Sequence, residues 1–122
     1  MNLDTLNDKQ IEAVKTTEGP ILILAGPGSG KTKVITHKIA YLLEEDKCNP
    51  WEILAITFTN KAAKEMKVRL EGLIGDAAKG MQISTFHAFG LKIIKENYDF
   101  FHLNSTFTIL DESDSISVIK KV

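Results

Sequence analysis

The stretch Ala25-Gly26-Pro27-Gly28-Ser29-Gly30-Lys31-Thr32 decides the fold of this chain. It follows a continuous apolar run at residues 21–25 (ILILA) and precedes a segment whose apolar residues, from Val34 to Leu43, recur at helical spacing. A glycine-rich turn between a buried strand and a helix is the context that a phosphate-binding loop requires. Its small residues let backbone N–H groups point at phosphate oxygens, and the helix N-terminus adds the positive end of its dipole. The sequence therefore predicts that residues 25–32 bind a nucleoside triphosphate.

Within this loop, Lys31 has the reach to contact the β- and γ-phosphates, and the Thr32 hydroxyl can ligate Mg²⁺. We expect both to be catalytic. Ala25 stands where the usual pattern begins with glycine, which is tolerable if Ala25 keeps ordinary backbone angles. Three glycines would then adopt the unusual angles: Gly26, Gly28 and Gly30. The alternative is a strand-to-helix turn that binds nothing.

The rest of the chain alternates strand and helix. Asn7 and Gln10 predict a capped helix start, and residues 53–58 (ILAITF) and 81–86 (MQISTF) predict two further strands. Residues 62–74 predict a helix that ends at Gly75, residues 107–110 a short strand, and Ser113 the cap of a last helix. This order predicts an α/β fold with a parallel sheet flanked by helices. We find no linker and expect residues 1–122 to form one incomplete domain.

Composition excludes several classes of protein. The 15 basic and 16 acidic residues give a formal charge of −1, so no global field attracts nucleic acid. A single cysteine, Cys48, excludes an internal disulfide, and three scattered histidines do not have metal-ligand spacing. No apolar run reaches the ~20 residues of a membrane span, and the N-terminus does not read as a signal peptide. We expect a soluble, cytoplasmic protein with no membrane partner.

Four segments occur in an order that resembles the start of UvrD/PcrA/Rep-type superfamily 1 DNA helicases: residues 6–10 (LNDKQ), 25–32, 57–63 (TFTNKAA) and 84–87 (STFH). The resemblance covers nearly the whole chain. It implies a phosphate-loop NTPase of the RecA-like type, specifically the N-terminal part of the first motor domain. It also implies ATP and Mg²⁺ as cofactors, 3′→5′ movement on single-stranded DNA, and a longer chain that supplies a second RecA-like domain.

The resemblance assigns nucleotide contacts outside the loop. It implies that Gln10 reads the adenine edge, which a primary amide can do because it is both donor and acceptor. The alternative is that the Gln10 side chain only completes a capping box. Lys33 stands where relatives carry an arginine that stacks on the base, and a lysine covers a ring less well.

The resemblance also implies a single-strand track. Its first part is Phe58, Thr59, Asn60 and Lys61, where a strand ends and a helix begins. Ligands of open α/β sheets bind outside the carboxyl ends of the strands, where aromatic rings stack on bases and polar groups contact phosphates. Lys64, Lys67 and Arg69 add local positive charge. The alternative is that Phe58 fills the core, Asn60 caps the helix and the lysines form a solvated face.

The second part of the implied track is Thr85, Phe86 and His87, at the end of the third predicted strand. Buried packing of Phe86 or His87 is the competing interpretation. We interpret His37 as an ordinary helix residue.

One acidic pair resembles the Mg²⁺-binding motif of phosphate-loop motors: Asp111 and Glu112, after an apolar segment. We expect these residues to lie at a helix start and to hold no metal, because the helix dipole favours acidic groups there. Three alternative functions remain open: a helicase–nuclease, a compact phosphate-loop kinase and a non-catalytic nucleotide-binding module. The single arginine argues against the kinase, which needs several.

Overall fold

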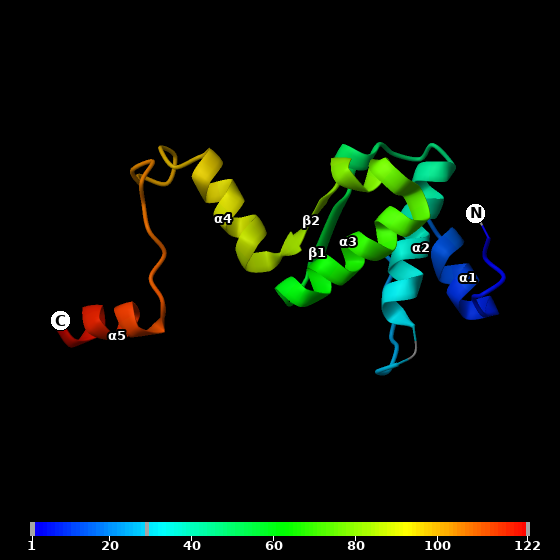
Figure 1. Ribbon diagram of the computed structural model, residues 1–122, viewed down its shortest axis with the longest axis horizontal. Coiled ribbons are helices and arrows are strands. Elements are labelled where there is room, and N and C mark those ends of the chain that lie inside the picture. Colours follow the sequence, from blue (N-terminus) through cyan, green and yellow to red (C-terminus); the bar gives the residue numbers. More distant parts are fainter. Residues whose placement is uncertain (1, 29, 122) are drawn as a thin grey trace. The chain divides into compact units, whose positions relative to one another are not determined.

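The computed structural model describes residues 2–28 and 30–121, which form two compact units. The first ends at Phe86 and the second begins at His87. The sequence predicts no domain boundary inside the chain, and the expectation that residues 1–122 form one incomplete domain stays a prediction. Figure 1 shows the order of the elements.

The first unit begins with two packed helices. Helix α1 (Asp8–Lys15) starts at a capping box, in which the backbone N–H of Gln10 donates to Asn7 Oδ1 and the Asn7 N–H donates to Gln10 Oε1, both at 2.9 Å. Helix α2 (Lys31–Glu44) lies beside α1. Their shared apolar cluster comprises Leu6, Ala13, Val14 and Val34. Packing of this cluster stabilises α1, because a helix this short is marginal alone.

A two-stranded parallel sheet follows. Strand β1 (Leu54–Thr57) pairs with β2 (Gln82–Thr85) in a register that runs from Leu54 opposite Gln82 to Thr57 opposite Thr85. Helix α3 (Asn60–Ile74) connects them and packs on the sheet. It ends at Gly75, whose φ of 62° is readily adopted by glycine. Two short 3₁₀ helices, η1 (Pro50–Glu52) and η2 (Gly75–Gly80), precede the strands. Strand–helix–strand therefore forms where the sequence predicts it.

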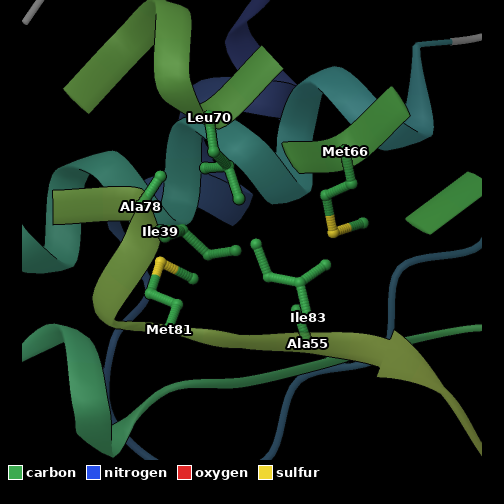
Figure 2. Close-up of a cluster of buried hydrophobic side chains, with 7 residues drawn as sticks. All are labelled: Ile39, Ala55, Met66, Leu70, Ala78, Met81 and Ile83. Atoms are coloured by element: carbon green, nitrogen blue, oxygen red, sulfur yellow. The ribbon is translucent and has the colours of Figure 1, made fainter. Parts of the chain in front are cut away.

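The main core lies between α3 and this sheet. Figure 2 shows Met66 and Leu70 of α3 directed toward Ala55 and Ile83 of the strands. Leu70 is fully buried. Burial of such a side chain contributes about 1.5–3 kcal/mol, so this cluster is what holds α3 on the strands.

Residues 21–25 do not form the predicted central strand. They are irregular, and Leu22 and Leu24 are 83% and 87% exposed. A strand requires a neighbour to satisfy its backbone N–H and C=O groups. Across residues 2–28 and 30–121, the only sheet is the pair β1–β2, so this apolar run is not paired with any strand.

The second unit contains two helices. Helix α4 (Phe86–Glu96) begins at the last residue of the first unit, and α5 (Glu112–Lys121) ends the described chain. Residues 107–110 do not form the predicted strand. The cap of α5 is Asp111, not Ser113, because Asp111 Oδ1 accepts from the Asp114 N–H at 2.7 Å. No helix among the described residues is long and apolar enough to cross a membrane.

Candidate nucleotide-binding site

The glycine-rich loop, residues 25–32, leads directly into α2. Gly30 is the N-cap of α2 and has left-handed angles (φ 84°, ψ 28°), and Gly28 has φ 73°. Both positions require glycine, as the sequence predicts. The same expectation for Gly26 is wrong, since its φ is not positive, while Ala25 keeps ordinary angles as expected. Ser29, also predicted to contact nucleotide, lies outside the described residues.

A cavity of about 370 Å³ opens beside this loop. Four of the residues predicted to contact nucleotide line it: Gln10, Ala25, Gly26 and Lys31. Lys31 is exposed at the first position of α2, and Thr32 is half-buried in the same turn. Pro27 and Gly28 are exposed in the turn that precedes them. The structure thus brings α1, the loop and the start of α2 together around one space.

Gln10 connects α1 to the loop. Its Oε1 atom accepts the Asn7 N–H, so the capping box proposed as the alternative is present. A Cβ atom placed on Gly30 would nevertheless lie only 3.0 Å from Gln10 Nε2. The amide therefore caps α1 and lies against the loop at the same time. The two interpretations of Gln10 are compatible, because a carbonyl oxygen has two lone pairs.

Two lysines of α2 contact the backbone around α1. Lys33 Nζ donates to the Thr5 carbonyl oxygen at 3.0 Å. Lys38 Nζ donates to the carbonyl oxygens of Ala13, at 2.9 Å, and Thr16. Burial lowers the pKa of the Lys38 ammonium.

Sequence reasoning did not single out Lys38. The available signal was its position four residues after the buried Val34, which places a charged residue on the packed side of α2.

A second group of predicted residues gathers at the carboxyl end of the sheet. Because β1 and β2 are parallel, Phe58 and Phe86 each follow the same end of neighbouring strands. Their side chains are 89% and 71% exposed, so the alternative that they fill the core is wrong. Thr85 is only 6% exposed, which leaves its side chain little surface with which to meet a ligand. His87, in the second unit, is exposed.

The start of α3 is capped by Thr59 and not by Asn60. The Ala62 N–H donates to Thr59 Oγ1 at 3.1 Å, and Thr57 Oγ1 donates to the Thr59 carbonyl oxygen at 2.9 Å. Asn60 and Lys61 are exposed in the first turn. The Thr59 hydroxyl accepts in the cap and still carries a proton to donate.

The remaining candidates have structural roles. His37 is buried in α2, where Nδ1 lies 2.7 Å from the Lys33 carbonyl oxygen, so it is the helix residue that we expect. Asp111 caps α5, and Glu112 and Asp114 lie in its first turn. The acidic pair, Asp111 and Glu112, therefore lies at a helix start, as we expect from the sequence. Among the residues that the structure describes, no group of three His, Cys, Asp or Glu side chains is placed to hold a metal ion.

The fold and the loop define a class of protein. It is an α/β protein in which a glycine-rich loop leads into a helix, beside a cavity that Gln10 helps to line. The family model described as UvrD/REP helicase N-terminal domain matches residues 6–122, and the chain belongs to this family.

Several curated proteins are similar to the chain over nearly its whole length. An ATP-dependent DNA helicase PcrA of Bacillus subtilis is 54% identical over 120 residues, which is 98% of this chain and 16% of that protein. The protein of the same name from Staphylococcus epidermidis is 56% identical over 117 residues, 96% of this chain and 16% of its own length. One from Staphylococcus aureus is 54% identical over 120 residues, with 98% and 16% covered. The chain thus spans about a sixth of the length of these relatives.

Proposed function

We propose that this chain is the ATP-binding front part of the first motor domain of an ATP-dependent DNA helicase. In this proposal residues 1–122 belong to one incomplete domain of the phosphate-loop, RecA-like type. The observation that carries it is the meeting of Gln10, the glycine-rich loop and Lys31 at one cavity. Its volume of about 370 Å³ lies in the range of small-molecule sites.

The loop would hold the triphosphate. The left-handed angles of Gly28 and Gly30 turn the backbone just before α2, where the helix N-terminus favours an anion. Lys31 would neutralise charge on the β- and γ-phosphates, and Thr32 would ligate the Mg²⁺ that travels with ATP. Magnesium supplies charge neutralisation of the phosphates when bound.

Gln10 would read the base. Its amide lies against Gly30, so a triphosphate on the loop would place its base within reach of α1. Adenine presents a donor and an acceptor side by side, which one amide can match, whereas guanine presents a different pattern. The capping box holds the amide in place before nucleotide arrives.

Single-stranded DNA would bind at the carboxyl end of the sheet. Phe58 and Phe86 expose rings there on which bases can stack, and Asn60 and Lys61 expose groups suited to phosphates. We leave the buried Thr85 side chain out of this surface. His87, exposed at the start of the second unit, stays a separate proposed DNA contact.

The names of the relatives support ATP use and DNA as the partner. The rest of the longer chain would supply the second motor domain and its arginines, which stabilise the charge that develops during hydrolysis. We place this motor in the cytoplasm, with movement in the 3′→5′ direction.

The test is Lys31→Ala in the full-length protein, with exposed Lys79→Ala as the matched control. We expect Lys31→Ala to lower ATP turnover by about 100-fold or more, because a charge-assisted phosphate contact is lost where charge develops. Affinity for an oligonucleotide without nucleotide should stay unchanged, and Lys79→Ala should match the wild type. Near-wild-type turnover in Lys31→Ala would overturn the assignment of the loop.

A further inference from the structure

Helix α1 is short and depends on contacts with other parts of the chain. It has eight residues, and a helix of that length is marginal without tertiary contacts. Its last carbonyl groups lack partners within the helix and must find them elsewhere. The Glu12 carbonyl oxygen accepts from the N–H and hydroxyl of Thr16, at 3.0 and 2.7 Å. The next carbonyl, that of Ala13, is satisfied from outside the helix.

Lys38 of α2 provides that outside partner. Its ammonium group donates to the Ala13 and Thr16 carbonyl oxygens, at the end of α1 where the helix dipole favours a positive charge. Burial lowers the pKa of this ammonium group, and its two hydrogen bonds to carbonyl oxygens offset the partial loss of water. The contact therefore specifies where the end of α1 lies on α2.

Lys33 holds the backbone just before the start of α1. Its ammonium group donates to the Thr5 carbonyl oxygen, just before the Asn7 cap. The two lysines thus contact the segment in the same order along both helices, Thr5 with Lys33 and then Ala13 with Lys38. The apolar cluster between α1 and α2 supplies attraction, but apolar contacts are non-directional and tolerate small slides.

Gln10 lies between these two attachments. Its amide is fixed to Asn7 by the capping box and lies against Gly30, so any movement of α1 along α2 carries the amide with it. A hydrogen bond weakens steeply once donor and acceptor move out of line, so a shift of about 1 Å is enough to disturb base reading.

We propose that Lys38, assisted by Lys33, is a positioning residue for nucleobase selection: it holds α1 on α2 so that Gln10 meets adenine. The inference rests on the proposed function and adds to it the residues that set base specificity. It assigns Lys33 a structural attachment in this chain. Neither lysine touches the nucleotide in this role.

The test compares the dissociation constants of ATP and GTP for the full-length protein and four variants: Lys38→Met, Lys38→Arg, Gln10→Ala and the double variant Lys38→Met/Gln10→Ala. Methionine keeps an apolar stem of similar length and removes the donors, whereas arginine keeps them. Exposed Lys79→Met is the matched control for the substitution itself.

We expect Lys38→Met to reduce the preference for ATP over GTP by about 3- to 10-fold, the effect of about one misaligned hydrogen bond. Lys38→Arg should restore the preference, and Lys79→Met should not change it. In the Gln10→Ala background, Lys38→Met should cause no further loss of preference, because the two residues act through one contact. Amide hydrogen exchange should become faster in α1 and stay unchanged in α3.

The outcomes separate the two proposals. If the wild type does not prefer ATP, or if Lys31→Ala turns ATP over at a near-wild-type rate, the proposed function fails and this inference fails with it. If the wild type prefers ATP and Lys38→Met keeps that preference, or lowers it equally in the Gln10→Ala background, the positioning role alone is wrong. Should Lys38→Met not fold, Lys38→Gln replaces it, because its shorter amide cannot reach both carbonyls.

Discussion

Substitution of Gly30 by alanine tests the geometry on which the candidate site depends. Gly30 caps α2 at φ 84° and ψ 28°, a conformation that costs an alanine about 1–2 kcal/mol. The new Cβ would also lie 3.0 Å from Gln10 Nε2, and this amide cannot swing aside without leaving its capping box. We therefore expect Gly30→Ala to destabilise the start of α2 by about 1–2 kcal/mol and to weaken ATP binding by about 10-fold or more.

Gly72→Ala is the matched control, with the opposite expected sign. Gly72 lies inside α3, has no positive φ and would place its Cβ in open space. Alanine at such a position stabilises a helix by about 0.5–1 kcal/mol. The two glycine-to-alanine changes should thus differ by about 2 kcal/mol in their effects, although their chemistry is identical.

The assay is native-state amide hydrogen exchange in the full-length protein, which reports the free energy of opening for α2 and α3 separately, together with ATP titration. We expect lower protection in α2 for Gly30→Ala and higher protection in α3 for Gly72→Ala. Unchanged protection of α2 together with wild-type ATP affinity would refute the left-handed geometry of Gly30 and its closeness to Gln10.

Three further variants test other parts of the molecule. Asn60→Ala with Lys61→Ala should weaken oligonucleotide binding and reduce its salt dependence by about one unit of slope, measured by salt titration, because one phosphate-neutralising charge is lost; unchanged binding would remove this surface from the track. Asp111→Asn with Glu112→Gln should leave kcat of the full-length enzyme within about 3-fold, because these residues begin α5; a loss as large as that of Lys31→Ala would make them catalytic acids. Leu70→Ala should destabilise the first unit by about 2–5 kcal/mol in hydrogen exchange of α3, and a smaller effect would contradict its place in the core.

Local signals in the sequence predict much of this fold. The capping box at Asn7, the start of α2 after the loop, and the end of α3 at Gly75 all depend on residues within a few positions of one another. Strands β1 and β2 are also predicted, because each is a short apolar run next to a helix and the two pair with each other.

Two features that the sequence does not reveal depend on distant partners, and one error, the cap of α5, is local. Residues 21–25 have the composition of a strand, but composition does not supply a neighbour with which to pair. Ser113 is a good capping residue, yet Asp111 has the favourable position relative to Asp114. The attachment of Lys38 to Ala13 crosses 25 positions of sequence, and a periodicity argument about one helix contains no information about it.

For the candidate site, the sequence predicts which residues contribute to it, but not their contacts or their exposure. Gln10 is a capping residue and a neighbour of the loop at once, a result that only the closeness of Gly30 reveals. Exposure decides between interpretations that the sequence leaves balanced: Phe58 and Phe86 are at the surface, and Thr85 is not.

The exposed apolar run has a consequence for self-association. Residues 21–24 are uncharged isoleucine and leucine, a composition that favours pairing between copies of a chain when the backbone is outside a sheet. Pro20 and Pro27 bracket this run, and neither can donate to a β-ladder. Intermolecular β-pairing through this run would therefore be confined to the six residues between the two prolines. We expect replacement of either proline to lengthen the segment that is available for intermolecular β-pairing.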